Sequence, residues 1–305
     1  MKIGVLGIGG VGSLIASNLL KENHEVYCFG STESNKFLKK NGIAFKSNIY
    51  GNSNLFPYFN LSKDQFLDFL FVTVKGNNLI KALATYKKFF NKDTIAITLL
   101  NGLGHKEEIQ KHFDINLIVG TIGSLEVSLN KNRVAIHKSQ CKANIELASS
   151  DKKLQLHLVN LKKILEKAGI YCTIYEDENY VIWSKLIRLS VISIINTLSN
   201  SNLGNSFIKE ETRILFLPLI EEFCLIGEKL GFNFKPKNIY EKIKTLPDNL
   251  TTSMQKDIYL GNDSEIEYIV GAPLKLGKSF GLKLPIMNKC YLEINDFINK
   301  NRNEK

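Results

Sequence analysis

Three glycines near the start of the chain have the spacing that a phosphate-binding turn requires. They are Gly7, Gly9 and Gly12, in the segment KIGVLGIGGVGSLIA. The first glycine of such a turn permits a sharp bend, the second lets the backbone approach a pyrophosphate, and the third allows close helix–strand packing. The free N–H groups of the following helix then bind phosphate oxygens. The pattern predicts a dinucleotide site in a loop made of Gly7, Ile8, Gly9, Gly10, Val11 and Gly12.

The flanking residues supply the strand and the helix that this turn needs. The spacing of apolar residues predicts a buried strand at 3–6, a helix at about 11–22 and a second strand at 25–29. A lysine followed by an apolar run is also typical of a signal peptide. Four glycines would weaken a signal helix, however, and no small-residue cleavage site follows. The strand–helix–strand interpretation is therefore favoured.

The residues after the second strand bear on the choice between NAD and NADP. An acidic residue there binds the ribose 2′-hydroxyl of NAD, whereas a basic residue accommodates the 2′-phosphate of NADP. This chain offers the hydroxyls of Ser31 and Thr32 with Lys36 nearby, while Glu33 argues the other way. We expect NADP(H) as the cofactor, with Ser31 among its contacts, and NAD as the less favoured alternative.

Strands and helices continue to alternate through the first half of the chain. Apolar runs predict strands at 67–74, 94–100, 117–119 and 134–137, and helices at 78–90, 105–112 and 151–168. This alternation predicts a doubly wound, Rossmann-like sheet that binds ligands beyond the carboxyl ends of its strands. Lys75 and Asn101 follow two of those strands, so both are candidate cofactor contacts. The alternatives are a surface lysine at 75 and, at 101, a turn former with positive φ.

The second half of the chain has the periodicity of helices alone. These are expected at 180–198, 208–230, 239–244, 265–280 and 285–299. We therefore expect two domains, an NADP-binding Rossmann-like α/β domain at 1–176 and an all-α domain at 177–305. An α/β half followed by an all-α half resembles many dehydrogenases, and this resemblance implies that the helical domain is the substrate and catalytic domain.

Composition excludes several other classes of protein. The 305 residues are 44% hydrophobic and 23% charged, as in ordinary globular proteins. The net charge of +10 fits nucleic acid, but the lysines are scattered and no recognition motif accompanies them. The longest apolar stretch, at 186–198, is interrupted by polar residues and is too short to span a membrane. The five cysteines form no CxxC pair and the five histidines no ligand spacing, so we expect no metal and a reducing, cytoplasmic setting.

Three further segments of the chain sharpen the assignment. They are NGLG at 101–104, WSKL at 183–186, and SMQKDI at 253–258 followed by EIEYI at 265–269. The glycine turn is common to many families, whereas the other two are far more specific. With the N-terminal glycine loop they resemble the ketopantoate reductase family, in the same order and over nearly the whole chain.

The resemblance implies an NADPH-dependent reduction of 2-dehydropantoate (ketopantoate) to pantoate. Lys185 would protonate the oxygen as hydride reaches the 2-keto carbon, and Glu265 would hold substrate and cofactor in place. Ser253 would bind the substrate, and Asn101 would contact both molecules. A lysine ammonium is a suitable donor, and a nearby glutamate keeps it charged. Taken singly, Lys185 could be a surface lysine at a helix start, and Glu265 a carboxylate that complements a helix dipole.

The chain also departs from the family at its substrate-binding helix. Leu189 and Ser193 stand where the family carries asparagines, and Asn196 follows a little further on the same helical face as Lys185. Ser193 and Asn196 are therefore candidate substrate contacts, while Leu189 invites a less polar substrate.

Two alternatives stay open on these grounds. One is a reductase of a different 2-oxo acid, and the other is a catalytically silent NADP-binding sensor. The joint presence of Lys185, Ser253 and Glu265 argues against the sensor. The expected partner is a small 2-oxo acid, with a homodimer left open and neither nucleic acid nor membrane expected.

Overall fold

The computed structural model describes residues 1–62, 64–123 and 125–303, and the chain forms two compact units. Unit 1 comprises residues 1–100 and 105–181. Unit 2 comprises residues 101–104 and the chain from Ile182 onward. The boundary expected at residue 176 stays a prediction, but the turn at 101–104 groups with the helical unit rather than with the sheet that precedes it.

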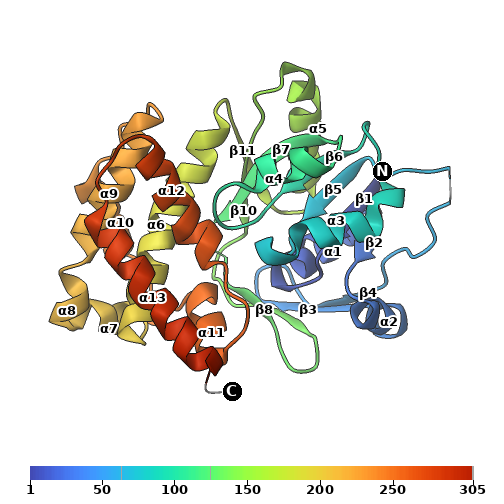
Figure 1. The fold of residues 1–305 in the computed structure, drawn as a ribbon. Helices are drawn as coiled ribbons and strands as arrows, with labels where there is room; N and C mark the ends of the chain where they lie inside the picture. Colours follow the sequence, from blue (N-terminus) through green and yellow to red (C-terminus); the bar gives the residue numbers. More distant parts are fainter. Residues whose placement is uncertain (63, 124, 304–305) are drawn as a thin grey trace. The chain divides into compact units, whose positions relative to one another are not determined.

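Unit 1 is built on a largely parallel sheet (Figure 1). In the described part of the chain its strands lie in the order β11-β10-β7-β6-β5-β1-β2. Their bounds are Lys2–Leu6 (β1), Glu25–Phe29 (β2), Phe69–Val72 (β5), Ile95–Thr98 (β6), Asn116–Gly123 (β7), Asn144–Ala148 (β10) and Tyr171–Tyr175 (β11). From β7 to β2 all neighbours are parallel, whereas β10 runs antiparallel to β7. Leu6 pairs with both Phe29 and Val72, so β1, β2 and β5 end at one edge.

Helices cover both faces of this sheet. Successive strand residues point to opposite sides, and here both sides carry apolar side chains that helices bury. Ile3 and Val5 pack with α1 (Gly10–Lys21) and α5 (Gln155–Lys167). Leu6 packs on the other face with α3 (Leu79–Tyr86) and α4 (His105–His112). The remaining helices of this unit are α2 (Thr32–Asn41) and the short 3-10 turns Gly76–Asn78, Lys87–Phe89 and Lys152–Leu154. The expected doubly wound α/β fold is confirmed.

A second, smaller sheet was not expected from the sequence. Its strands lie in the order β4-β3-β9-β8, with bounds Ile43–Ser47 (β3), Ser53–Leu55 (β4), Val127–Leu129 (β8) and Ala135–His137 (β9). The strand expected at 134–137 thus belongs here and not to the main sheet. Helix α1 contacts strands of both sheets and lies between them. A Cβ on Gly10 would come within 2.2 Å of the Val127 carbonyl oxygen, so this glycine makes room for β8.

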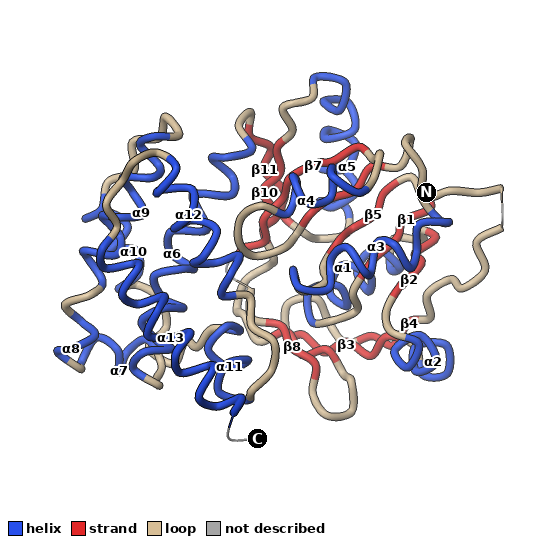
Figure 2. Tube along the Cα trace, in the orientation of Figure 1, coloured by secondary structure: helices blue, strands red, loops and turns tan. Residues whose placement is uncertain are grey.

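Within the described residues of unit 2, the regular elements are helices joined by loops, and no strand is present (Figure 2). Its helices are α6 (Glu178–Ser199, which begins in unit 1), α7 (Leu203–Ile208), α8 (Glu210–Arg213), α9 (Phe216–Lys229), α10 (Pro236–Lys244), α11 (Ser253–Leu260), α12 (Ala272–Ser279) and α13 (Pro285–Asn303). Among the described residues, α6 is long and apolar enough to cross a membrane by length and composition alone. However, 67% of its most apolar window is buried inside the protein, as in a core helix.

Two expected helices of unit 2 differ from the structure. The single helix expected at 208–230 is wrong, because the chain breaks into α7, α8 and α9. Lys209 has an extended backbone, and Pro218 favours a new helix start just before it. The helix expected at 265–280 begins with a π-helical turn, Glu267–Gly271, ahead of α12. Pro273 has no N–H to offer the Ile269 carbonyl, which instead accepts the Ser190 hydroxyl at 2.8 Å.

Candidate active site

The glycine loop after β1 is held in a fixed shape by its neighbours in unit 1. Gly7 has φ +100°, and its N–H donates to the Phe29 carbonyl at 2.8 Å. The Thr73 hydroxyl donates to the Gly7 carbonyl at 2.7 Å. A Cβ on Gly12 would lie 2.0 Å from the Gly7 oxygen, which explains why that position needs glycine. Thr73 was missed at the sequence level, because nothing in the spacing marks its hydroxyl.

Gly9 differs from the other glycines of the loop. A Cβ there would meet no atom of the described protein within 4 Å, so the fold itself does not require a glycine. Its backbone faces open space directly before the first turn of α1. This is the access that a cofactor pyrophosphate needs, so the residues present fit a dinucleotide. Ile8 and Val11, also expected in the loop, are half-buried against the core of unit 1.

The end of β2 is organised by hydrogen bonds from α2. Ser31 is exposed and caps α2, where its hydroxyl accepts the N–H of Ser34 at 3.2 Å. The Asn35 side chain accepts the Gly30 N–H at 2.9 Å and so holds the strand end. Lys75 is exposed and precedes the turn Gly76–Asn78, shortly after β5. Ser31 and Lys75 therefore both follow strands that end at the same edge of the sheet.

Lys185 and Asn101 meet within unit 2. The half-buried Lys185 lies on α6, and its Nζ donates to Asn101 Oδ1 at 2.7 Å. The turn that carries Asn101 is anchored by the N–H of Leu103, which donates to the Tyr268 carbonyl at 2.9 Å. Positive φ occurs at Gly102 and not at Asn101, so the alternative of Asn101 as a left-handed turn former is wrong. Its side chain serves Lys185 instead.

Glu265 lies two residues before the π-helical turn that anchors the 101–104 turn. Its side chain is only 7% exposed, and its backbone carbonyl accepts the N–H groups of Tyr268 and Ile269. A π-helical turn inside a helix is frequently found at functional sites. Ser253 is exposed as the first residue of α11, after the capping residue Thr252. Both candidates therefore lie at the starts of helical segments of unit 2.

Ser193 and Asn196 lie inside the helical core. Asn196 is fully buried, and its amide donates to the Leu250 carbonyl at 3.1 Å while its oxygen accepts the Ser206 hydroxyl at 3.0 Å. Ser193 is also fully buried, and its Oγ has no hydrogen-bond partner within the described residues. Leu189, one turn before it, is half-buried against the same core. Asn196 is thus committed to structural bonds, whereas Ser193 keeps an unused hydroxyl.

The structure also bears on metal binding. Among residues 1–62, 64–123 and 125–303, no group of three or more His, Cys, Asp or Glu side chains is placed to hold a metal ion. The site therefore contains the ammonium of Lys185, which can only donate hydrogen bonds and is oriented by the Asn101 amide. The same chain carries a glycine loop of the kind that binds dinucleotides.

A glycine loop open to a dinucleotide in a doubly wound α/β unit, together with Lys185 oriented by Asn101 in a helical unit, is typical of a class of oxidoreductases. More particularly, the chain belongs to the ketopantoate reductase family. The model described as ketopantoate reductase PanE/ApbA matches residues 3–152, and the model of the family's C-terminal domain matches residues 178–296.

Similar proteins cover almost the full chain at low identity. A 2-dehydropantoate 2-reductase of Lactococcus lactis is 23% identical over 295 residues, which are 93% of this chain and 94% of that protein. The solved structure of D-mandelate dehydrogenase with NADH and anilino(oxo)acetate has a TM-score of 0.88 at 20% identity, covering 98% and 99% of the two chains. A dimeric ketopantoate reductase from Staphylococcus aureus has a TM-score of 0.81 at 20% identity, with 98% and 99% covered.

Proposed function

We propose that this protein reduces a 2-oxo acid with NADPH, that Lys185 donates the proton, and that 2-dehydropantoate is the leading substrate. The observation that carries the proposal is the 2.7 Å hydrogen bond from Lys185 Nζ to Asn101 Oδ1. It supports a lysine that is oriented by a neighbouring amide rather than one that merely extends into solvent. The family membership and the 2-dehydropantoate 2-reductase relatives support the same reaction.

Each residue of the proposed site has its own role in the reaction. The bound cofactor would supply hydride to the keto carbon, and negative charge would then develop on the carbonyl oxygen. A lysine ammonium has three N–H donors, so one can bond Asn101 while another reaches that oxygen and transfers its proton. Glu265, in the same unit, is proposed to hold substrate and cofactor in place, as the family resemblance implies. The exposed Ser253 hydroxyl and the unused hydroxyl of Ser193 are the proposed substrate contacts, and Asn196 is assigned to the core.

The cofactor is proposed to bind at the glycine loop of unit 1. The open backbone at Gly9 and the first turn of α1 would accept the pyrophosphate, and the cation of Lys75 at the same sheet edge would add a contact to phosphate or ribose. The side chains of Ile8 and Val11 also shape the loop by packing on the core of unit 1, and Gly10 makes room for β8.

Replacing the proposed acid tests the mechanism. For Lys185→Ala we expect kcat with 2-dehydropantoate to fall by about 10²- to 10⁴-fold, since general acid catalysis contributes about that much. The Kd for NADPH should stay within about twofold, because Lys185 belongs to unit 2. Lys229→Ala removes an exposed lysine from the same unit and is the matched control. Unchanged turnover in Lys185→Ala would remove the lysine from the mechanism.

A second candidate is a reductase of a less polar 2-oxo acid. Leu189 favours it, because an apolar side chain replaces a substrate-gripping amide of the family. The similar fold of D-mandelate dehydrogenase, solved with NADH and anilino(oxo)acetate, supports it as well. Turnover of a panel of 2-oxo acids of graded polarity, with NADPH and with NADH, separates the two. Cofactor binding without oxidation by any of them would support the silent sensor.

We also propose a reducing, cytoplasmic setting and a homodimer. Four cysteines are buried as free thiols, and burial raises the pKa of each, which keeps them protonated and unreactive. They are Cys28, Cys172, Cys224 and Cys290. The similar dimeric ketopantoate reductase from Staphylococcus aureus supports the proposed homodimer. Light scattering of the purified protein would measure its molar mass in solution and so test this proposal.

A further inference from the structure

The end of β2 lies beside a cation that comes from a distant part of the chain. Arg133 belongs to the hairpin between β8 and β9, 99 residues after Ser34, yet its Nη2 donates to Ser34 Oγ at 2.5 Å. Its guanidinium also lies over the Phe37 ring, with its carbon 5.2 Å from the ring centroid. Ser34 and Phe37 are both on α2, the helix that follows β2. A basic group is therefore held where the strand end itself offers only hydroxyls.

The hairpin holds Arg133 in an unusual backbone conformation. Its φ is +59°, a region that residues other than glycine rarely adopt. The turn is closed by Asn130, whose carbonyl accepts the Arg133 N–H at 2.9 Å and whose side chain accepts the Val134 N–H at 2.9 Å. Such conformations persist where the surroundings hold them, and they concentrate at functional sites. The conformation sends the arginine toward α2.

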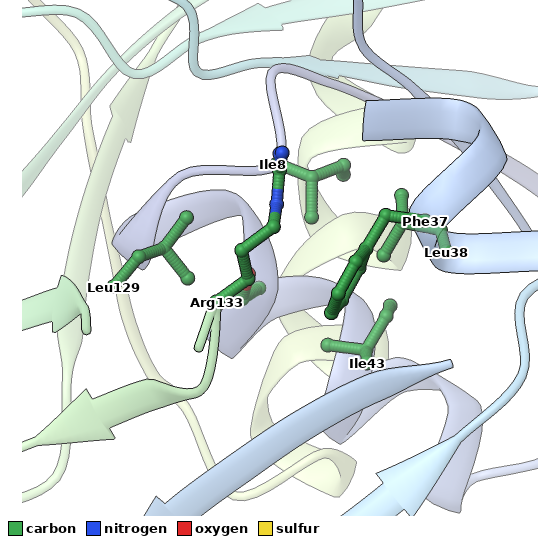
Figure 3. Close-up of a pocket in the computed structure, with 7 residues that line it drawn as sticks. Ile8, Phe37, Leu38, Ile43, Leu129 and Arg133 are labelled. Carbon is green, nitrogen blue, oxygen red and sulfur yellow. The ribbon is translucent and has the colours of Figure 1, made fainter. Parts of the chain in front are cut away.

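Arg133 shares a small pocket with the glycine loop. The pocket is lined by Ile8 from the loop, by Phe37 from α2 and by Leu129 from β8, and all of these belong to unit 1. Figure 3 shows the Arg133 side chain between Leu129 and Phe37, with its nitrogen atoms toward Ile8. In a doubly wound sheet the adenosine ribose of a dinucleotide lies between the glycine loop and the end of the second strand. The guanidinium lies in that region.

The charge partners of Arg133 favour an external anion. Ser34 is neutral, and the carboxylate of Glu33 is 3.9 Å away with its side chain 90% exposed. An exposed pair at that distance contributes little, because water and salt screen it. The arginine side chain itself is 30% exposed. A guanidinium binds a phosphate through two parallel N–H bonds, whereas a ribose hydroxyl leaves its charge uncompensated.

We propose that Arg133 binds the 2′-phosphate of NADP(H), together with the hydroxyls of Ser34 and Ser31, and that it sets the preference for NADP over NAD. In this site the β8–β9 hairpin supplies the basic residue that the end of β2 lacks. The inference rests on the proposed function only in requiring that unit 1 binds a dinucleotide.

Fluorescence titration with NADPH and with NADH, without substrate, tests the assignment. For Arg133→Ala we expect the Kd for NADPH to rise about 10- to 100-fold and the Kd for NADH to stay within about threefold. Arg133→Lys keeps the charge but loses the paired N–H geometry, so an intermediate loss is expected. Lys131→Ala removes an exposed cation from the same hairpin and should change neither Kd by more than about twofold.

Three results would overturn the assignment. An equal loss of affinity for NADPH and NADH in Arg133→Ala would mean that Arg133 contacts a part that both cofactors share. No loss of affinity for either would mean that Arg133 does not contact the cofactor. If Lys131→Ala lost as much affinity for NADPH as Arg133→Ala, the effect would come from the net positive charge of the hairpin and not from a specific contact of Arg133. If the wild-type protein bound neither nucleotide, the proposed function itself would fail. If the wild type bound both and Arg133→Ala bound them as well, only this inference would fail.

The neighbouring carboxylate provides a test in the opposite direction. Glu33→Gln removes the negative charge beside the guanidinium without changing the size of the side chain. We expect NADPH to bind about two- to fivefold more tightly and NADH not to gain. Weaker NADPH binding in Glu33→Gln would contradict the proposed electrostatics.

Discussion

At the scale of single residues, the ammonium of Lys185 donates a hydrogen bond to the amide oxygen of Asn101. Asn101 approaches it from a turn that is 84 residues earlier in the chain and that packs on the π-helical turn before α12. An ammonium held by an amide oxygen has a defined direction for its remaining N–H groups. We propose that substrate selection depends on the positions one and two turns further along α6, where this chain has Leu189 and Ser193 and the family resemblance implies amides.

Restoring one of those amides tests how selection works. Leu189→Asn should raise the ratio of kcat/KM for 2-dehydropantoate to that for a less polar 2-oxo acid by about tenfold or more, since paired hydrogen-bonding groups discriminate strongly. Leu198→Asn places the same amide at another half-buried position of α6 and should leave the ratio unchanged. Equal losses on both substrates in Leu189→Asn would show that position 189 serves packing alone.

At the scale of elements, α9 caps the start of α13. The buried carboxylate of Glu222 accepts the N–H of Ile286 at 2.8 Å and that of Met287 at 2.7 Å. Pro285 begins α13 and has no N–H to satisfy. A charge-bearing acceptor therefore satisfies two of the unpaired donors at that helix end. This contact joins two long helices within the core of unit 2.

Removing this cap should cost measurable stability. For Glu222→Ala we expect the free energy of unfolding to fall by about 1.5–3 kcal/mol, because two buried N–H groups lose a charged acceptor. Glu221→Ala, at the exposed neighbouring residue, should change it by no more than about 0.5 kcal/mol. Urea unfolding followed by circular dichroism measures both. Equal effects would mean that the capping bonds add nothing.

The same carboxylate predicts the sign of a pH effect. Burial raises the pKa of Glu222, and the two N–H bonds oppose that rise only in part. The folded state then binds the proton more tightly than the unfolded state, so the contribution of Glu222 to stability falls as pH rises through its titration. The unfolding free energy of the wild type minus that of Glu222→Gln should therefore decrease from acid to neutral pH. An increase would contradict the assigned direction.

At the scale of the whole molecule, the two units have separate hydrophobic cores. Trp183, the single tryptophan of the sequence, is 1% exposed in the core of unit 2, where its Nε1 donates to the Phe223 carbonyl at 3.2 Å. Tryptophan fluorescence therefore reports unit 2, whereas far-ultraviolet circular dichroism reports both units.

A ligand of unit 1 should stabilise the two units unequally. NADP⁺ at about 100 times its Kd should add about 2.7 kcal/mol to the stability of the unit that binds it. In urea we expect the circular dichroism transition to move further than the Trp183 fluorescence transition. Identical shifts in the two signals would show that the molecule unfolds as one cooperative body.

The sequence by itself determined the elements whose signals are local. The strand–turn–helix around Gly7, Gly9 and Gly12 follows from apolar spacing and glycine positions within about 20 residues, and the structure has it where expected. The apolar periodicity of α6 likewise predicted a helix that carries Lys185, because that pattern repeats every few residues. The prediction of one helix at 208–230 was wrong. It followed the apolar periodicity and took no account of Pro218, which breaks a continuous helix.

Only the tertiary structure decided which distant side chains meet. Asn101 contacts Lys185 across 84 residues, and Arg133 contacts Ser34 across 99. Such pairs leave no mark in local periodicity, because they depend on how sheets and helices pack after the elements form. The second sheet was missed for the same reason, since its strands are short and the parallel pairing of β3 with β9 joins segments about 90 residues apart.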